Sequence, residues 1–288
     1  MLGHTPVLLE EVMKFLDPKP GGRFIDATLG AGGHTRAILE RTAPDGRVLA
    51  IDQDELALAG ARESLQSFGS RLIMEHSNFK NIAPLAAGHG FLEVEGVLAD
   101  IGISSMMVDD PSRGFSFMRE GPLDMRMDRT QDLTAADVVN TYAEKEIADI
   151  LYTYGEERRS RPIARSIVRA RPLRLTTDLT RAIERVMGGP RGRIHPATRT
   201  FQALRIFVNG ELSSLESFLD SSMTVIRSGG RLVVITFHSL EDRIVKQKFR
   251  TPPVPGRVLT KKVVVATEEE VRRNPRARSA KLRAWEKS

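Results

Sequence analysis

Cysteine is absent from this chain of 288 residues, and its absence excludes several kinds of chemistry. Disulfides, thiolate metal sites and cysteine nucleophiles all require the missing thiol, and we expect no bound metal. Long apolar runs are also missing, because none approaches the roughly 18 residues that a membrane span requires. The first residues lack the basic and apolar segments of a secretory signal. We therefore expect a cytoplasmic protein that makes no use of a membrane.

The net charge of +6 is distributed unevenly along the chain. Residues 156–205 hold 13 arginines, four acids and no lysine, and residues 243–288 hold 14 basic and four acidic residues. The rest of the chain is acidic. Basic segments on an acidic core are typical of a protein that binds a polyanion, and guanidinium groups suit phosphates and bases. We favour a nucleic acid, with Arg165, Arg169 and Arg171 on its face, over arginines that merely cover solvated helices.

A glycine-rich turn is the central motif of the sequence. The apolar run 24–26 ends in an acid, Gly30, Gly32 and Gly33 follow, and a helical pattern begins at once. Glycines between a strand and a helix let the backbone approach a ligand at the positive end of the helix. Thr35 occupies the sixth position, where the dinucleotide fingerprint has glycine or alanine. A tight turn without a ligand is the alternative interpretation.

Acidic residues follow three predicted parallel strands, at 24–25, 47–51 and 94–99. Their positions are Asp26, Asp52 and Asp100. The carboxyl ends of such strands meet at one edge of a doubly wound α/β sheet, so these acids are expected to converge. Asp52, about 20 residues beyond the glycines, occupies the place where a nucleoside ribose finds an acceptor. The sequence therefore predicts a nucleoside-binding crevice at this edge.

Beyond Asp100 the alternation of strands and helices stops. Residues 101–118 predict a long loop of the kind that covers active sites, and residues 133–207 predict only helices, two of them beginning after Thr134 and Thr141. A buried strand follows at 231–237, then a helix, a pair of edge strands and a basic arm from Arg272. The expected domains are residues 1–105, a helical substrate-recognition insertion with its lid loop at 106–208, and residues 209–288 with the basic arm.

Methyl transfer from S-adenosylmethionine would be restricted by the missing cysteine. Methylation of pyrimidine C5 through a thioether is excluded, so an amine, a ring nitrogen or a hydroxyl must attack directly. An exocyclic cytosine amine is a weak nucleophile, and an acceptor for its protons would favour the attacking form. Asp100 is the candidate acceptor, unless it caps the loop or contacts only the cofactor. His238, after the last buried strand, is a second catalytic candidate, unless it only braces its loop.

Long motifs extend over nearly the whole chain, at residues 4–7, 26–34, 114–128, 195–206, 237–243 and 274–279. Together they resemble the bacterial small-subunit ribosomal RNA methyltransferase H family, which methylates the N4 amine of a cytidine in the decoding region. The resemblance implies a Rossmann-like class I S-adenosylmethionine-dependent methyltransferase fold with a helical insertion. It also implies 16S ribosomal RNA as the partner, within the small ribosomal subunit, and leaves a homodimer open.

The resemblance carries specific residues onto this sequence. The implied cofactor contacts are Gly32, Gly33, His34, Asp52, Phe79 and Asp100. Met107 stands where the family has a cofactor-binding glutamine, so that a backbone contact survives the change and a side-chain amide contact does not. The candidate substrate contacts in the insertion are Arg113, Phe115, Phe117 and Arg199. The two phenylalanines either stack a base or anchor the loop to the core.

Four alternatives to this function remain at the level of the sequence. A nicotinamide-dependent oxidoreductase is disfavoured by Thr35 and by the basic insertion. A non-catalytic RNA-binding assembly factor, or an enzyme that methylates a different RNA amine, would share the same fold. A DNA cytosine N4 methyltransferase would carry a Ser/Asp-Pro-Pro-aromatic turn, whereas this chain has Asp100-Ile101-Gly102-Ile103.

Overall fold

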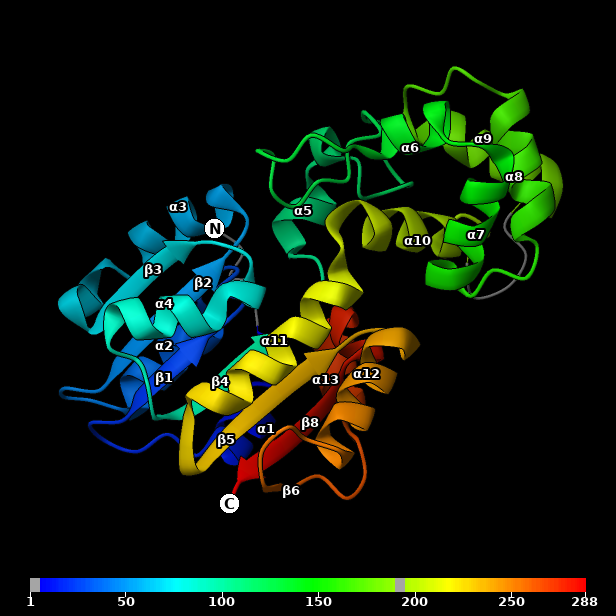
Figure 1. The fold of residues 1–288 in the computed structure, drawn as a ribbon. Helices are drawn as coiled ribbons and strands as arrows, with labels where there is room; N and C mark the ends of the chain where they lie inside the picture. The colour runs from blue at the N-terminus through cyan, green and yellow to red at the C-terminus, as the bar shows by residue number, and fades with distance from the viewer. Residues whose placement is uncertain (1–5, 190–194) are drawn as a thin grey trace. The chain divides into compact units, whose positions relative to one another are not determined.

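The computed structural model describes residues 6–189 and 195–288, and His4 of the first motif lies outside these ranges. The chain forms two compact units (Figure 1). We call Met1–Gly102 together with Leu212–Ser288 the sheet unit, and Ile103–Glu211 the helical unit. Within the described ranges, no helix combines the length and the apolar character that crossing a bilayer requires.

The sheet unit is organised around one mixed β-sheet with the strand order β3-β2-β1-β4-β5-β8-β6, and β7 also pairs with β8. Strands β1 to β5 are parallel, and β8 is antiparallel to its partners. The strands are β1 (Arg23–Asp26), β2 (Arg47–Asp52), β3 (Leu72–His76), β4 (Val94–Asp100), β5 (Ile226–Thr236), β6 (Gly256–Val258), β7 (Val264–Val265) and β8 (Lys281–Lys287). The order reverses between β1 and β4, where sheets of this kind open a crevice at the carboxyl ends of the strands.

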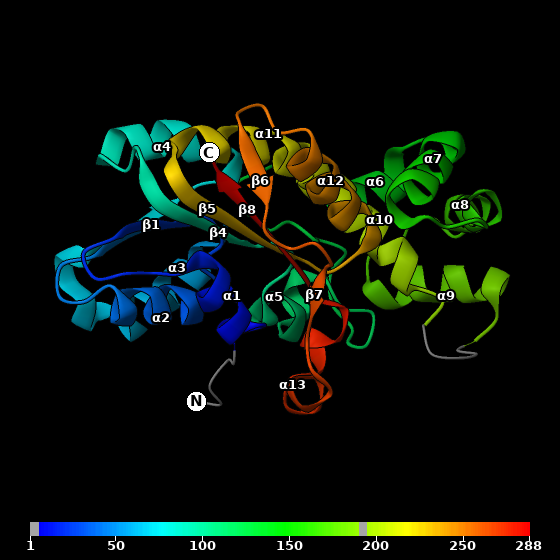
Figure 2. The same cartoon turned by 90° about the horizontal axis from the view of Figure 1, so that it is seen from below.

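Helices cover both faces of this sheet (Figure 2). One face carries α1 (Leu9–Leu16), α2 (Gly33–Arg41) and α3 (Glu55–Ser64), and the other carries α4 (Ile82–His89), α11 (Glu211–Val225) and α12 (Ser239–Arg250). Successive strand residues alternate between two hydrophobic clusters, one on each face of the sheet. Phe24 packs in the cluster with α1, α2 and α3, and Ile25 packs in the cluster with α4, α11 and α12. This double burial explains why the parallel strands are continuous apolar runs.

The prediction of a basic arm from Arg272 is wrong. Its segment folds into α13 (Glu268–Arg273), a short 3-10 helix (Pro275–Ser279) and β8, which forms six residue pairs with β5. Its charges are compatible with a sheet because they are paired: the Arg283 guanidinium donates to the Asp242 carboxylate at 2.7 Å. Trp285 of the same strand is fully buried.

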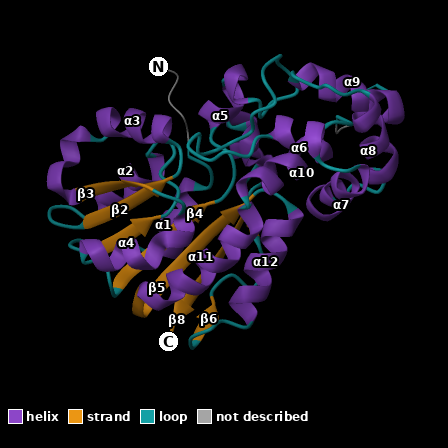
Figure 3. Cartoon of the chain, turned by 45° about the horizontal axis from the view of Figure 1, so that its top comes forward, coloured by secondary structure: helices purple, strands orange, loops and turns teal. Residues whose placement is uncertain are grey.

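The helical unit contains α5 (Ser105–Asp109), α6 (Ala135–Thr141), α7 (Glu144–Gly155), α8 (Ser160–Arg169), α9 (Thr176–Met187) and α10 (Thr198–Asn209). A long loop joins α5 to α6 (Figure 3). The helix predicted after Thr134 is confirmed, because Thr134 and Asp137 form a capping box. The start predicted at Thr141 is wrong: α6 includes Thr141, and α7 begins after Ala143 with Glu146 bonded to the Ala143 N–H.

Candidate functional site

Asp26 organises the turn that leaves β1. Its carboxylate is 1% exposed, and it accepts the Thr28 N–H at 3.1 Å and the Thr35 hydroxyl at 2.6 Å. Burial raises the pKa of Asp26 to about 6, against the opposing effect of these two hydrogen bonds. Thr35, which replaces the last glycine of the dinucleotide fingerprint, therefore locks the start of α2 onto the end of β1.

Glycines give this turn its shape and leave space beside it. Gly30 and Gly32 have φ values of 50° and 80°, in the left-handed region that favours glycine. A Cβ on Gly32 would lie 2.7 Å from the Leu65 side chain, so this position is closed by packing. A Cβ on Gly30 would meet no atom within 4 Å. The turn therefore presents open backbone at Gly30, next to the N-terminus of α2.

Asp52 ties this turn to the end of β2. Its Oδ2 accepts the Gly30 N–H at 2.7 Å, and its Oδ1 accepts the Asp54 N–H at 2.9 Å. Burial raises the pKa of Asp52, although both hydrogen bonds favour the carboxylate. Each oxygen keeps a second lone pair that can accept from a ligand hydroxyl. Asp52 is thus held in a fixed orientation at the carboxyl edge of the sheet.

Asp100 is the last residue of β4, which pairs with β1 on the side opposite β2. One oxygen of its carboxyl group lacks a hydrogen-bond partner among the described residues. Its Oδ1 is buried and has no hydrogen-bond partner among the described residues. Its backbone N–H donates to the Thr28 hydroxyl at 2.6 Å, which fixes the strand end. Burial, followed by repulsion from Asp26 and Glu241, raises the pKa of Asp100 to about 8. A buried acceptor without a donor indicates a place where a ligand completes the site.

His34 lies at the first turn of α2, close to Asp100. Its Nε2 is 3.0 Å from the Val7 carbonyl, and its Nδ1 is 3.9 Å from Asp100 Oδ2. A carbonyl only accepts, so Nε2 carries the proton in this contact. Phe79 follows β3 and is half-buried, with its ring edge-to-face on Phe218 at 5.2 Å between centroids. Both residues were expected as cofactor contacts, and both belong to elements at the carboxyl edge of the sheet.

His238 follows β5 and is held by Glu241 in a capping box at the start of α12. Its Nδ1 accepts the Glu241 N–H at 3.4 Å, so the proton lies on Nε2, which is 2.9 Å from Glu241 Oε1. The same carboxylate accepts the Phe237 N–H at 2.8 Å. The Phe237 ring covers Gly102, where a Cβ would lie 3.3 Å from it. His238 therefore caps the start of α12 and is fixed in this turn.

Two of the four candidate substrate contacts are buried in the helical unit, and a third, which is half-buried, packs against its core. Arg113 is 1% exposed and donates to the carbonyls of Arg126 and Met127 at 3.0 and 2.9 Å. Phe115 is buried, and Phe117 stacks on His195 at 4.6 Å. These side chains anchor the lid loop, so the structure favours anchoring over base stacking. Arg113 could not be recognised as buried from its sequence alone, because arginine is usually exposed.

The other predicted contact residues of the helical unit differ in their burial and in their hydrogen bonds. Met107 packs in the core, and its N–H donates to the Ser104 hydroxyl at 3.2 Å. Arg171 also has a structural role, since it donates to the Val139 carbonyl at 2.7 Å and to the Tyr142 carbonyl. Placing it on the RNA face is therefore a mistake. Arg199 is exposed, with one bond to the Glu156 carbonyl at 3.2 Å.

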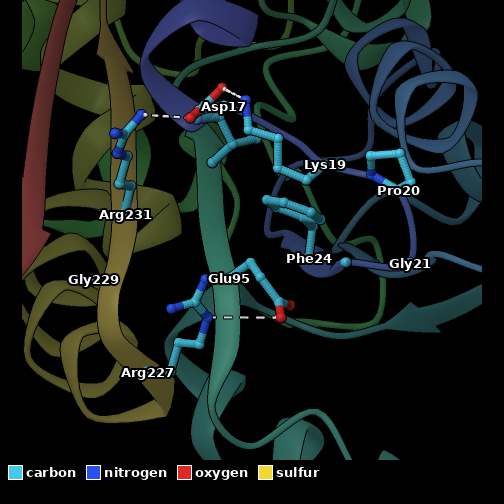
Figure 4. A pocket seen from close by; sticks show the side chains of 11 residues that line it. Asp17, Lys19, Pro20, Gly21, Phe24, Glu95, Arg227, Gly229 and Arg231 are labelled. Carbon is cyan, nitrogen blue, oxygen red and sulfur yellow. Dashed lines mark ion pairs between the residues drawn. The ribbon is translucent and has the colours of Figure 1, made fainter.

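A hollow of the sheet unit lies at the opposite edge, where β1, β4 and β5 begin (Figure 4). Its charged side chains neutralise one another in pairs. Asp17 lies 2.6 Å from Lys19 and 3.6 Å from Arg231, and Arg227 lies 3.7 Å from Glu95. Among the described residues, none that lines this hollow carries a buried polar side-chain atom without a hydrogen-bond partner, unlike the edge that carries Asp100. The carboxyl edge is therefore the candidate site.

Sequence reasoning did not identify two contributors to this site. Thr28 binds both the Asp26 carboxylate, through its N–H, and the Asp100 N–H, through its hydroxyl. Pro6 covers Gly33, where a Cβ would lie 2.9 Å from its ring. Thr28 lies inside the glycine motif, so its spacing offered a signal. Pro6 lies in the motif at residues 4–7, but its contact with Gly33 arises from tertiary folding and could not be read from that motif.

Comparison with known proteins agrees with the geometry. The chain matches the MraW methylase family over residues 1–288. Relatives named ribosomal RNA small subunit methyltransferase H are 49% identical in Dehalococcoides mccartyi, covering 99% of this chain and 86% of the relative, and 51% in Thermomicrobium roseum, covering 99% and 93%. In Sorangium cellulosum the identity is 53%, covering 98% and 90%.

Among solved structures, that of PH0851 aligns with a TM-score of 0.50 at 14% identity, covering 97% of this chain and 45% of the other. This likeness shows the fold alone, which is Rossmann-like. The predicted fold class and cofactor are confirmed. The chain belongs to the MraW methylase family.

Proposed function

We propose that this chain transfers the methyl group of S-adenosylmethionine to the N4 amine of a cytidine in the decoding region of 16S ribosomal RNA. The observation that supports it best is the buried, unpartnered Oδ1 of Asp100 beside the glycine turn. The relatives' name, ribosomal RNA small subunit methyltransferase H, supports the substrate class. The proposal places the reaction in the cytoplasm, on the small ribosomal subunit.

The residues of the carboxyl edge fit a cofactor with a ribose, an adenine and a charged end. The open backbone at Gly30, with Gly32, Gly33 and His34, would hold the amino-acid end near the N-terminus of α2. Asp52, already oriented by the Gly30 N–H, would accept from the ribose hydroxyls, and Phe79 would lie beside the adenine. When bound, this cofactor supplies a methyl group on a cationic sulfur.

Asp100 would serve both the cofactor and the acceptor. A cationic ligand in front of the carboxyl lowers its pKa and restores the carboxylate, because opposite charges favour the ionised form. The carboxylate would then accept a hydrogen bond from the N4 amine and favour its attacking form. His238 would act through the turn that it shares with Glu241, as a positioning residue.

The RNA face is proposed on the exposed arginines of the helical unit. Arg161, Arg165 and Arg169 follow one another at intervals of four residues on α8, and all three are exposed. Residues four apart lie on one side of a helix, so the three guanidinium groups form a line suited to successive phosphates. Arg199 at the start of α10 is a further candidate contact.

A labelled methyl-transfer assay tests this function. Isolated small ribosomal subunits from cells without this protein are incubated with the protein and labelled S-adenosylmethionine, and the RNA is digested to nucleosides. Label in N4-methylcytidine at one position is the expected result. Label in another nucleoside would move the proposal to a different RNA amine. Cofactor binding without transfer to subunits, naked RNA or DNA would refute it in favour of an assembly factor.

A further inference from the structure

We propose that Glu270 is a positioning residue for the cofactor site, because it clamps the segment Pro6–Leu8 over the start of α2. The inference rests on the cofactor site proposed above and adds a residue from the opposite end of the chain. Its central observation is a hydrogen bond in which the Leu8 N–H donates to Glu270 Oε1 at 2.7 Å, across 262 residues of sequence.

The clamped segment is held against its own backbone preference. Leu8 has φ 53° and ψ 37°, a left-handed conformation that costs free energy for a residue with a Cβ. Such conformations persist only where surrounding contacts determine them. Leu8 is fully buried, Val7 is 5% exposed, and both belong to the hydrophobic cluster that also contains Ala277 and Ala280. The side chains of this apolar cluster offer no acceptor to the Leu8 N–H, and the Glu270 carboxylate provides one.

The segment touches the cofactor site at two points. The Val7 carbonyl accepts from His34 Nε2 at 3.0 Å, which fixes the tautomer of the ring and directs Nδ1 toward Asp100 Oδ2 at 3.9 Å. The Pro6 ring lies over Gly33, closely enough that a Cβ there would approach it to 2.9 Å. A displacement of the segment would therefore release the His34 ring and change the surface above Gly33.

Glu270 is itself well fixed for this purpose. It is the third residue of α13, and its N–H donates to the Thr267 hydroxyl at 3.1 Å, so the helix start is capped. Continuous contacts thus run from α13 through Leu8 and Val7 to His34. The C-terminal region of the sheet unit thereby sets the geometry at the first turn of α2.

The test compares three variants of the full chain in the absence of RNA. Glu270→Ala removes the acceptor, Glu270→Gln keeps an oxygen acceptor at the same place, and Glu268→Ala is the matched control. Glu268 is exposed in the same first turn of α13, so both alanine variants remove one negative charge from the same helix end. The measurements are the Kd for S-adenosylmethionine by calorimetry, the melting temperature, and hydrogen exchange of the peptide that contains Leu8.

We expect Glu270→Ala to raise the Kd about three- to tenfold, since a fraction of molecules must re-form the clamp before they bind. Exchange in the Leu8 peptide should accelerate, and Glu270→Gln and Glu268→Ala should behave like the original chain. With RNA added, kcat at saturating cofactor should be unchanged in Glu270→Ala, while KM for the cofactor rises.

Three results would overturn the clamp. These are an unchanged Kd in Glu270→Ala, even with a lower melting temperature; an equal loss of affinity in Glu268→Ala; and no rescue by Glu270→Gln. Failure of the original chain to bind S-adenosylmethionine would instead refute the proposed function. The two failures are therefore distinguishable in one calorimetric series.

Discussion

Replacing Asp100 by asparagine is expected to stabilise the sheet unit at neutral and alkaline pH, although it should weaken cofactor binding. The carboxyl is buried beside Asp26 and Glu241, which raises its pKa from 3.8 to about 8. Below pH 4 both the folded and the unfolded chain hold its proton, so the group has no effect on stability. Between pH 4 and 8 the unfolded chain releases the proton while the folded chain retains it, and the free energy of unfolding falls. Above pH 8 the loss is constant.

The size of this effect follows from the pKa difference. Each pKa unit corresponds to about 1.4 kcal/mol, so the displacement from 3.8 to about 8 sets an upper bound of about 6 kcal/mol at alkaline pH. Local relaxation and water entry reduce such penalties, and we expect Asp100→Asn to gain about 2–4 kcal/mol at pH 8. At pH 4 the two proteins should be equally stable. The amide of this variant also lacks the charge that would face the cationic cofactor.

Urea unfolding between pH 4 and 9, without cofactor, measures this difference. The fluorescence of Trp285, the single tryptophan of the chain, reports on the sheet unit, because Trp285 is buried and pairs with Leu232 of β5. The stability difference between variant and original chain should grow with pH and level off near pH 8. A difference independent of pH, or a variant less stable at pH 8, would refute the argument that Asp100 is a buried acid with a raised pKa.

Three further variants test the site and the surface. Asp52→Ala should weaken binding of S-adenosylmethionine about 10- to 100-fold, since the ribose hydroxyls lose a charged acceptor and Gly30 loses its tether; unchanged calorimetric affinity would exclude this role. Joint replacement of Arg161, Arg165 and Arg169 by alanine should weaken RNA binding and reduce the slope of log K against log salt by about 2–3, whereas an unchanged slope would place the RNA elsewhere. Arg171→Ala should leave this slope unchanged and lower stability by about 2 kcal/mol in thermal unfolding, because two carbonyls lose their donor.

Much of the sheet unit could be predicted because its strands obey a simple rule. Strands buried on both faces are continuous apolar runs, and β2, β4 and the second half of β5 have that form. β8 departs from it, since Arg283 and Glu286 are charged. Their charges are matched by Asp242 and by Arg231, which lie far away in the sequence. Those partners could not be known before the fold, so the strand resembled a solvated arm.

The acids of the site could be located in the same way, because each follows a predictable strand. The different hydrogen-bond partners of these acids could not be predicted. Both oxygens of Asp26 accept hydrogen bonds within the turn, and Asp52 is held by backbone N–H groups. Of these three acids, only Asp100 has a buried oxygen without a partner among the described residues. These differences depend on Thr28 and on packing. Arg113 and Arg171 illustrate the same limit, because a buried arginine and an exposed one look alike in a sequence.

The place of β8 in the sheet has a consequence for synthesis of the chain. It lies between β5 and β6, pairs with both, and is translated after every other strand. The sheet unit therefore cannot complete its hydrogen bonding while β8 is inside the ribosome. The helical unit is one continuous stretch, Ile103–Glu211, with local helix pairs, so it can form earlier. The nascent chain would thus present a folded helical unit between two halves of an unfinished sheet.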